Sequence, residues 1–344
     1  MGNEILISIK DKVAIIALNR PKALNALSLV MIKTINKALS EFENNDNIKA
    51  ILLKSATKRG FCAGGDIKSA RQHMLDGRSE KIDEYFAAEY ALDSKIAKFS
   101  KPIVVIANGI VMGGGLGLAG HAKFRITTPD SHFAMPEAAI GFVCDCGIDA
   151  ILAKIDRHIA LAFLLSGEVV GAEDALALGL SDFIVDSDAL DSLENELIKV
   201  MSLDDNLRAI NDLLIAKNIA KKNSAFIKKA NSCKSAFSNV NIKEIINSLK
   251  QLSKNNETAK AFYNKLILLC PTSLNAILLS HDKVRKHQNL RLALVSDLKL
   301  AIFMAKRHDF IEGVRAVIID KDQNPKWQPD DFNAINQALI LANI

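Results

Sequence analysis

Several features that assign proteins to special classes are missing from this 344-residue sequence. It has five cysteines, an odd number whose spacing matches neither a disulfide framework nor a metal site, which favours a reducing, intracellular compartment. The N-terminus passes directly into the strand-like sequence EILISIKDKVAIIAL and shows the pattern of neither a secretory signal nor a transit peptide. We therefore expect a cytoplasmic protein.

A strong charge of either sign is also missing. The formal net charge is +5, with 49% apolar and 24% charged residues, the balance of a soluble globular protein. Short basic clusters such as Lys221-Lys222 and Lys228-Lys229 are typical of solvated helix faces, so we expect no nucleic-acid partner. A mild positive field would still suit a substrate that carries phosphates.

One uncharged stretch, residues 102–121, is long enough to raise the question of a membrane span. It contains six glycines together with Asn108. A buried strand, a tight turn and a closely packed helix start explain so many glycines better, so we expect no membrane partner.

The order of the predicted elements indicates an α/β fold. Apolar runs predict strands at residues 4–9, 12–18, 48–53, 102–107 and 124–128. Helical spacing predicts helices from an N-cap at Ser28 to about Glu43 and over about 80–99. This strand–strand–helix repetition fits a core whose active site lies in loops beyond strand ends. From about residue 190 the pattern is mostly helical, so we divide the chain into a core, 1–195, and a mainly helical region, 196–344.

Two glycine-rich turns follow predicted strands: FCAGGDIK at residues 61–68 and MGGGLG at 112–117. Glycine lets a backbone approach a ligand closely, and a helix N-terminus offers unpaired N–H donors. One such turn alone would favour tight packing, but two could direct one N–H each at a single oxygen, as in an oxyanion hole. A dinucleotide-binding fingerprint fails on spacing, because position 118 is leucine.

Two carboxylates, Glu137 and Asp145, stand in the mainly apolar segment FAMPEAAIGFVCD at residues 133–145. A carboxylate is costly to bury unless it is paired or used. The apolar run around Glu137 lacks an obvious basic neighbour, so we favour a functional role over a helix cap or an ion pair. For Asp145, an N-cap and a functional role are equally open.

The remaining candidates are weaker. Isolated histidines such as His121 and His132 are more often structural, and the sequence has neither a nucleophile-elbow serine nor a histidine pair at metal spacing. Cys144 and Cys146 are too close for a CxxC pair, and we interpret them as ordinary thiols. We expect Trp327 to anchor a tail by packing. No metal or redox cofactor is expected.

Four segments, in this order and spacing, resemble the crotonase superfamily: NRPKALNAL, FCAGGDIK, MGGGLGL and FAMPEAAIG, over residues 12–142. The C-terminal segments CPTSL (270–274) and RHDFIEGVRAVIIDKDQNPKWQP (307–329) resemble one branch, the 3-hydroxyisobutyryl-CoA hydrolases of valine breakdown. The resemblance implies a crotonase-like core of repeated ββα units with a helical C-terminal region.

The resemblance also implies roles for individual residues. The oxyanion-hole N–H groups would be those of Gly65 and Gly114. CoA, which is part of the substrate and no separate cofactor, would lie along Lys22, Ala23, Leu24, Ala63, Asp66, Ile67 and Lys68.

The catalytic carboxylates distinguish the branches. Hydratases of the superfamily use two glutamates; one matches Glu137, but the other falls at Gly117, which has no side chain. The hydrolase branch uses the equivalents of Glu137 and Asp145, with a glutamate matching Glu89 near the acyl group. This implies hydrolysis of a short 3-hydroxyacyl-CoA, first of all 3-hydroxyisobutyryl-CoA, with Glu137 as nucleophile or general base.

Two alternatives stay open at this point. One is an enoyl-CoA isomerase or hydratase, and the other is a non-catalytic acyl-CoA-binding scaffold. Members of the superfamily often form trimers or hexamers, so a homo-oligomer is also open.

The sequence departs from the hydrolase pattern at residues 143–149. The hydrolases usually have Phe-Pro-Asp-Val-Gly-Gly-Gly, and this chain has Val-Cys-Asp-Cys-Gly-Ile-Asp. Cys144 replaces the proline, and Ile148 and Asp149 replace two glycines. We expect a reshaped loop around Asp145, which affects the identity of the substrate more than CoA binding.

Overall fold

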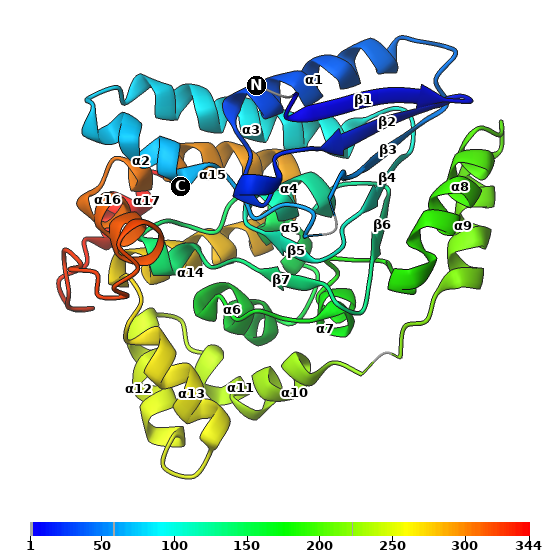
Figure 1. Ribbon diagram of the computed structural model, residues 1–344. Coiled ribbons are helices and arrows are strands. Elements are labelled where there is room, and N and C mark those ends of the chain that lie inside the picture. Colours follow the sequence, from blue (N-terminus) through cyan, green and yellow to red (C-terminus); the bar gives the residue numbers. More distant parts are fainter. Residues whose placement is uncertain (1–2, 58, 222) are drawn as a thin grey trace. The chain divides into compact units, whose positions relative to one another are not determined.

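A computed structural model describes residues 3–57, 59–221 and 223–344 (Figure 1). The chain forms two compact units, each assembled from three stretches. The first unit comprises Met1–Gly65, Ala91–Phe133 and Val170–Asn223, and the second comprises Asp66–Tyr90, Ala134–Val169 and Ser224–Ile344. The proposed division of the sequence near residue 195 stays a prediction.

A six-stranded sheet in the order β1-β2-β3-β4-β6-β8 forms the centre of the first unit. Its strands are β1 (Ile5–Lys10), β2 (Val13–Leu18), β3 (Ala50–Ser55), β4 (Ile103–Ile106), β6 (Phe124–Thr127) and β8 (Phe183–Ile184). β1 and β2 are antiparallel, and all other neighbours are parallel. Because interior parallel strands are buried on both faces, they appear in the sequence as unbroken apolar runs, and the predicted strands are confirmed within about two residues.

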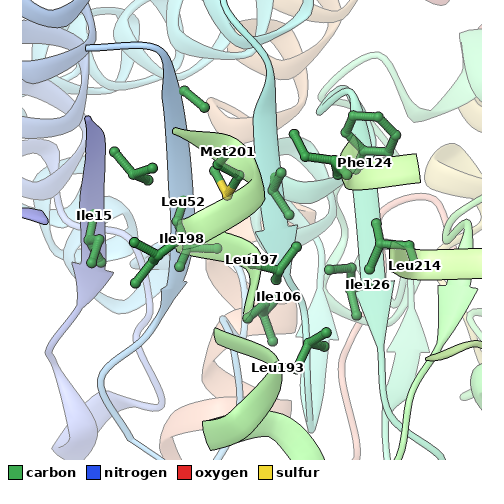
Figure 2. Packing of buried hydrophobic residues seen from close by; sticks show 14 of the residues in the cluster. Ile15, Leu52, Ile106, Phe124, Ile126, Leu193, Leu197, Ile198, Met201 and Leu214 are labelled. Carbon is green, nitrogen blue, oxygen red and sulfur yellow. The ribbon is translucent and has the colours of Figure 1, made fainter. Parts of the chain in front are cut away.

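Helices α8 (Leu190–Met201) and α9 (Asn206–Lys217) cover one face of this sheet (Figure 2). Alternate strand residues such as Ile15, Leu52 and Ile126 point to one side, as the two-residue period of a strand requires. Leu193 and Leu197, one helical turn apart, pack against them. The result is a continuous apolar layer between the sheet and the helix pair.

Helix α1 (Leu29–Glu43) begins where its predicted cap placed it. The Ser28 hydroxyl accepts a hydrogen bond from the backbone N–H of Met31 at 3.1 Å. The other elements of this unit are η1 (Pro21–Ala23), β5 (Ile110–Met112), α4 (Gly114–Gly120), β7 (His132–Ala134), α7 (Ala172–Ala177) and η3 (Ser187–Ala189).

The second unit is helical. Helix α3 (Glu80–Lys98) contributes its residues up to Tyr90. The remaining elements are α2 (Ile67–Leu75), η2 (Glu137–Ile140), α5 (Ile148–Leu152), α6 (Arg157–Ser166), α10 (Ala225–Ser232), α11 (Lys234–Phe237), α12 (Ile242–Leu252), α13 (Glu257–Leu266), α14 (Pro271–His287), α15 (Leu290–Ala305), α16 (His308–Val314), η4 (Arg315–Ile319) and α17 (Gln337–Leu341).

Every described element after β8 is a helix, so the predicted α/β fold with a helical C-terminal region is confirmed. Within the described residues, a single helix long and apolar enough to cross a membrane is absent. The pair α13–α14, which is bent by 112°, reaches that length and composition only jointly.

Candidate functional site

The two glycine turns of the first unit lie side by side. The backbone N–H of Cys62 donates to the carbonyl of Ile110 at 2.9 Å, and that of Met112 donates to the carbonyl of Cys62 at 3.0 Å. A Cβ built on Gly64, whose φ is +105°, would lie 3.6 Å from the amide nitrogen of Gly114. The two turns are therefore adjacent within this unit, and the convergence of their N–H groups on one oxygen stays a prediction.

The backbone at the second turn leaves no room for a side chain at Gly115. A Cβ on Gly115 would lie 2.4 Å from the carbonyl oxygen of Cys62, so glycine is required there for close packing. Among the described residues, neither the N–H of Gly65 nor that of Gly114 takes part in a hydrogen bond. Both donors are thus available to a ligand oxygen, as the predicted oxyanion hole requires.

Four of the residues assigned to CoA by resemblance lie in the first unit. Lys22 and Ala23 end η1, and Leu24 follows with φ +49°. The N–H of Ala63 donates to the carbonyl of Leu24 at 3.0 Å, which places these residues next to the first glycine turn.

The other three, Asp66, Ile67 and Lys68, open helix α2 in the second unit. The Asp66 side chain caps this helix by accepting from the N–H of Ser69 at 3.2 Å. Lys22 and Lys68 are exposed.

Glu137 is the first residue of η2 in the second unit, and only 7% of it is exposed. The thiol of Cys144 is a side-chain hydrogen-bond donor to it, with 3.6 Å between Sγ and Oε2, and a backbone N–H also donates to this carboxyl. The residue that caps η2 is Pro136, so Glu137 is not the N-cap of this element.

Asp145 is 5% exposed and accepts with both oxygens. The hydroxyl of Tyr90 donates to Oδ2, and the thiol of Cys146 donates to Oδ1 at 3.2 Å. The residue that caps α5 is Gly147, so the N-cap interpretation of Asp145 is wrong. Asp145 is instead a buried carboxyl group that accepts hydrogen bonds from two side chains.

Burial raises the pKa of both carboxyl groups. The pKa of Glu137 lies well above its ordinary range, first because the group is buried and second because Asp145 is negatively charged. Burial raises the pKa of Asp145 to about 6, although the hydrogen bonds from Tyr90 and Cys146 oppose the rise. The two groups therefore hold a proton at pH values where an exposed carboxyl has lost it, a property common at reactive carboxylates.

Tyr90 was missed by the sequence reasoning, although its neighbour Glu89, also buried, was singled out. Phe86, four residues earlier on α3, stacks on Tyr90 at 5.9 Å between ring centroids and on Phe142 at 5.2 Å. The spacing of Phe86 and Tyr90 could have indicated one buried face of α3. No local pattern connects position 90 with position 145.

The thiols of Cys144 and Cys146, which the sequence indicated to be ordinary, act as hydrogen-bond donors to the two carboxyl groups. Burial, and then the charge of Glu137, raises the pKa of Cys144 well above its ordinary range, so the group stays protonated and acts as a donor. Each candidate reacting carboxylate thus has a neighbouring S–H group as a hydrogen-bond donor.

The C-terminal segments support the turn that carries Glu137. The N–H of Cys270 donates to the carbonyl of Ala138 at 3.1 Å. A Cβ on Gly141, whose φ is +68°, would lie 2.2 Å from the carbonyl oxygen of Asp309, and one on Gly313 would lie 2.4 Å from the carbonyl carbon of Ile140. Helices α14 and α16 therefore pack directly against η2.

Trp327 contacts the segment that follows helix α13. Its indole N–H donates to the carbonyl of Leu268 at 3.0 Å. The indole is thus attached to the chain after α13, and its role as a packing anchor stays a prediction.

Curated relatives match almost the whole chain. The 3-hydroxyisobutyryl-CoA hydrolase of Homo sapiens, described as mitochondrial, is 34% identical over 98% of this chain and 87% of its own length. That of Danio rerio is 32% identical over 98% and 88%. 3-Hydroxyisobutyryl-CoA hydrolase 1 of Arabidopsis thaliana is 33% identical over 98% and 90%.

Solved structures share the fold. A carnitinyl-CoA dehydratase from Mycobacterium thermoresistibile has a TM-score of 0.91 at 28% identity, with 99% of this chain and 96% of that chain covered. An enoyl-CoA hydratase from Rhodobacter sphaeroides has a TM-score of 0.89 at 28% identity, with 99% and 97% covered. A model of the enoyl-CoA hydratase/isomerase family matches residues 13–344. With this match over nearly its full length and the fold expected from the resemblance, the chain belongs to the enoyl-CoA hydratase/isomerase family, the crotonase family.

Proposed function

We propose that this protein is an acyl-CoA thioester hydrolase that acts on a short 3-hydroxyacyl-CoA. The first candidate substrate is 3-hydroxyisobutyryl-CoA, whose cleavage to 3-hydroxyisobutyrate and CoA belongs to valine breakdown. The observation that carries the proposal is the pair of buried carboxyls with raised pKa, Glu137 and Asp145, in a chain whose full-length relatives bear the hydrolase name.

In the proposed mechanism, the N–H groups of Gly65 and Gly114 bind the thioester oxygen as it becomes negative. Donors of this kind contribute about 3–4 kcal/mol each in a known protease case. The free N–H groups and the adjacent glycine turns in the first unit support this role.

Glu137 then attacks the thioester carbon, the C–S bond breaks, and CoA leaves as a thiolate. Water hydrolyses the resulting anhydride and regenerates the carboxylate. In the alternative form of the proposal, Glu137 removes a proton from the water that attacks the thioester directly. Asp145 orients the water or the substrate hydroxyl, and its two donors support the role of a fixed anion. This chemistry uses the thioester itself and requires no cofactor.

Hydration is disfavoured by the residue at position 117. A hydratase holds one water between two glutamates, and Gly117, buried in α4, supplies no carboxylate. Asp145 already accepts from Tyr90 and Cys146. Hydrolysis needs only a polarised carbonyl, one carboxylate and a good leaving group.

The test is an assay of the purified full-length protein with two readouts. Release of free thiol is followed with 3-hydroxyisobutyryl-CoA and 3-hydroxypropionyl-CoA, and the absorbance of the conjugated bond is followed with crotonyl-CoA. We expect thiol release from the hydroxyacyl esters and no loss of crotonyl absorbance.

The rival functions give different results. Rapid loss of crotonyl absorbance without thiol release would make the protein a hydratase. Binding of CoA esters without turnover of either kind would make it a scaffold. Both results contradict the proposal.

We also propose a reducing intracellular location, which the five free and buried cysteines support.

A further inference from the structure

A buried acid–base pair that the proposed mechanism does not use lies in the second unit. Asp149, in the first turn of α5, is 2% exposed, and His281, in the middle of α14, is fully buried. Nδ1 of His281 lies 3.0 Å from Oδ1 of Asp149, across 132 residues of sequence. Such a pair needs an explanation, because burying a carboxylate costs free energy unless a partner compensates it.

His281 is the one hydrogen-bond partner of the Asp149 side chain in the described part of the chain. There, neither Oδ2 of Asp149 nor Nε2 of His281 has a hydrogen-bond partner. The link between α5 and α14 through these side chains therefore rests on one hydrogen bond. Its loss would leave a buried carboxylate uncompensated, which is strongly destabilising.

The pair is connected to Asp145 through the backbone of the three intervening residues, Cys146, Gly147 and Ile148. The N–H of Ile148 donates to the carbonyl of Asp145 at 3.2 Å, and the N–H of Gly147 donates to Oδ2 of Asp297 on α15 at 2.8 Å. Asp149 is the residue after Ile148. The segment from Asp145 to Asp149 is thus attached to α15 at its middle residue, Gly147, and to α14 at its last residue, Asp149.

Asp149 also acts on Asp145 through its charge. It is among the charges that raise the pKa of Asp145, and it raises the pKa of Cys144 as well. The titratable groups around Asp145 come from several elements: Glu89 and Tyr90 of α3, Glu137 of η2, Cys144 and Cys146 of the loop, Asp149 of α5, His281 of α14 and Asp297 of α15. All but His281 are acidic, so His281 is the basic member of this group.

We propose that His281 is a positioning residue for the active-site loop: by pairing with Asp149 it fixes the start of α5, and thereby holds Asp145 in place. The proposal rests on the proposed function insofar as Asp145 serves hydrolysis. Asp149 stands where the hydrolases that this chain resembles usually have glycine. The proposal explains how the loop accommodates this aspartate, because its carboxylate has a partner of its own, His281 on α14.

The first experiment does not depend on activity. The protein is labelled with [4-¹³C]aspartate, and the Asp145 carboxyl signal is assigned with Asp145→Asn and titrated by NMR. Because the charge of Asp149 raises the pKa of Asp145, Asp149→Asn should lower that pKa. An unchanged titration would show that the pair does not act on Asp145.

The second experiment compares two substitutions of the histidine. His281→Asn keeps an N–H donor near the position of Nδ1, and His281→Leu removes it. With the ester that wild-type protein cleaves, His281→Leu should lower kcat roughly ten- to a hundredfold with a smaller change in KM, and His281→Asn should recover most of the loss. Equal activities of the two variants would contradict the proposal.

Hydrogen exchange and a double variant complete the test. His281→Leu should speed amide exchange in residues 143–152, and His281→Asn should not. Amide exchange in the double variant Asp149→Asn/His281→Leu should be closer to that of wild type than exchange in His281→Leu alone. The reason is that the double variant leaves no buried charge without a partner. If wild-type protein cleaves no ester, the proposed function fails, and the hydrogen exchange of the two His281 variants still decides the role of His281. If His281→Leu does not fold, Asp149→Asn and His281→Asn decide it.

Discussion

At the scale of single residues, the two candidate catalytic carboxyl groups of the second unit, Glu137 and Asp145, lie in different surroundings. Asp145 accepts from a phenol and a thiol, and Glu137 has the weaker thiol of Cys144 as its side-chain donor. A carboxylate with two donors is stabilised as a fixed anion, and one with a weak donor stays more basic and more reactive. These surroundings favour Glu137 as the reacting group.

We expect Glu137→Gln to abolish hydrolysis with little change in the affinity for CoA esters. The amide keeps the shape of the side chain but can neither attack nor accept a proton, and a positioned acid–base group contributes about 100- to 10,000-fold. Thiol release measures turnover, and calorimetric titration with CoA measures affinity. A variant with more than half of wild-type turnover would remove Glu137 from the mechanism.

Cys144→Ala should retain most of the activity, because a thiol whose pKa is raised by burial is a poor nucleophile. Cys144→Ser, which restores a hydroxyl donor to Glu137, is the matched control. Turnover and mass spectrometry after mixing with substrate are the measurements. Complete inactivity of the alanine variant, together with an acylated Cys144 in the wild type, would identify the thiol as the nucleophile.

The pH dependence of hydrolysis should show the coupling between the two carboxyls. Glu137 reacts as the carboxylate, so kcat/KM should rise with pH as Glu137 loses its proton. Since the charge of Asp145 raises the pKa of Glu137, Asp145→Asn should move this rise to lower pH even if the maximal rate falls. Asp145→Glu keeps the charge and should leave the rise near its wild-type position. A rise that moves to higher pH in Asp145→Asn would contradict the assignment.

At the scale of elements, the turn η2 is held by helices that follow it by more than a hundred residues. α14 meets it through a backbone hydrogen bond, and α16 meets it at Gly313, where a side chain has no room. The C-terminal sequence motifs therefore have a physical role as supports of the Glu137 turn.

Gly313→Ala should destabilise the protein by about 2 kcal/mol or more, although alanine is the better helix former. The added methyl group would lie 2.4 Å from the Ile140 backbone. Gly171→Ala, where nothing lies within 4 Å of the added Cβ, is the control and should change stability by less than about 1 kcal/mol. Urea unfolding measures both. Equal effects would show that α16 yields at this contact.

The sequence predicted the elements better than the contacts between them. β2 and β3 were recognisable because buried parallel strands leave unbroken apolar runs, and α1 because Ser28 provides a cap. The pairs Tyr90–Asp145 and His281–Asp149 join positions 55 and 132 residues apart. Pairings at such separations leave no local periodicity or spacing, so Asp145 could not be distinguished from an N-cap by its neighbours alone.

At the scale of the whole molecule, the second unit depends on its last stretch. Helices α14, α15 and α16 provide His281, Asp297 and the contacts to η2. The positions of Glu137 and Asp145 therefore depend both on the segment that contains them and on helices near the end of the chain.

Removal of residues 306–344 should abolish hydrolysis and lower the thermal midpoint, because the Glu137 turn loses α16. Removal of residues 336–344 deletes α17 and leaves α16 in place, so its effect should be much smaller. Thiol release and calorimetry are the measurements. A truncation at residue 305 with wild-type turnover would show that α16 is dispensable for the site.

The division of each unit into three stretches has a consequence during synthesis on the ribosome. All stretches of the first unit have been made once Asn223 has been added, but the second unit lacks residues 224–344 at that moment. At translation rates of 5–20 residues per second, that stretch takes roughly 6–24 s. At the start of this interval η2, α5 and α6 have none of the C-terminal helices that pack against them, so nascent chains of this length expose apolar surfaces that a chaperone would bind.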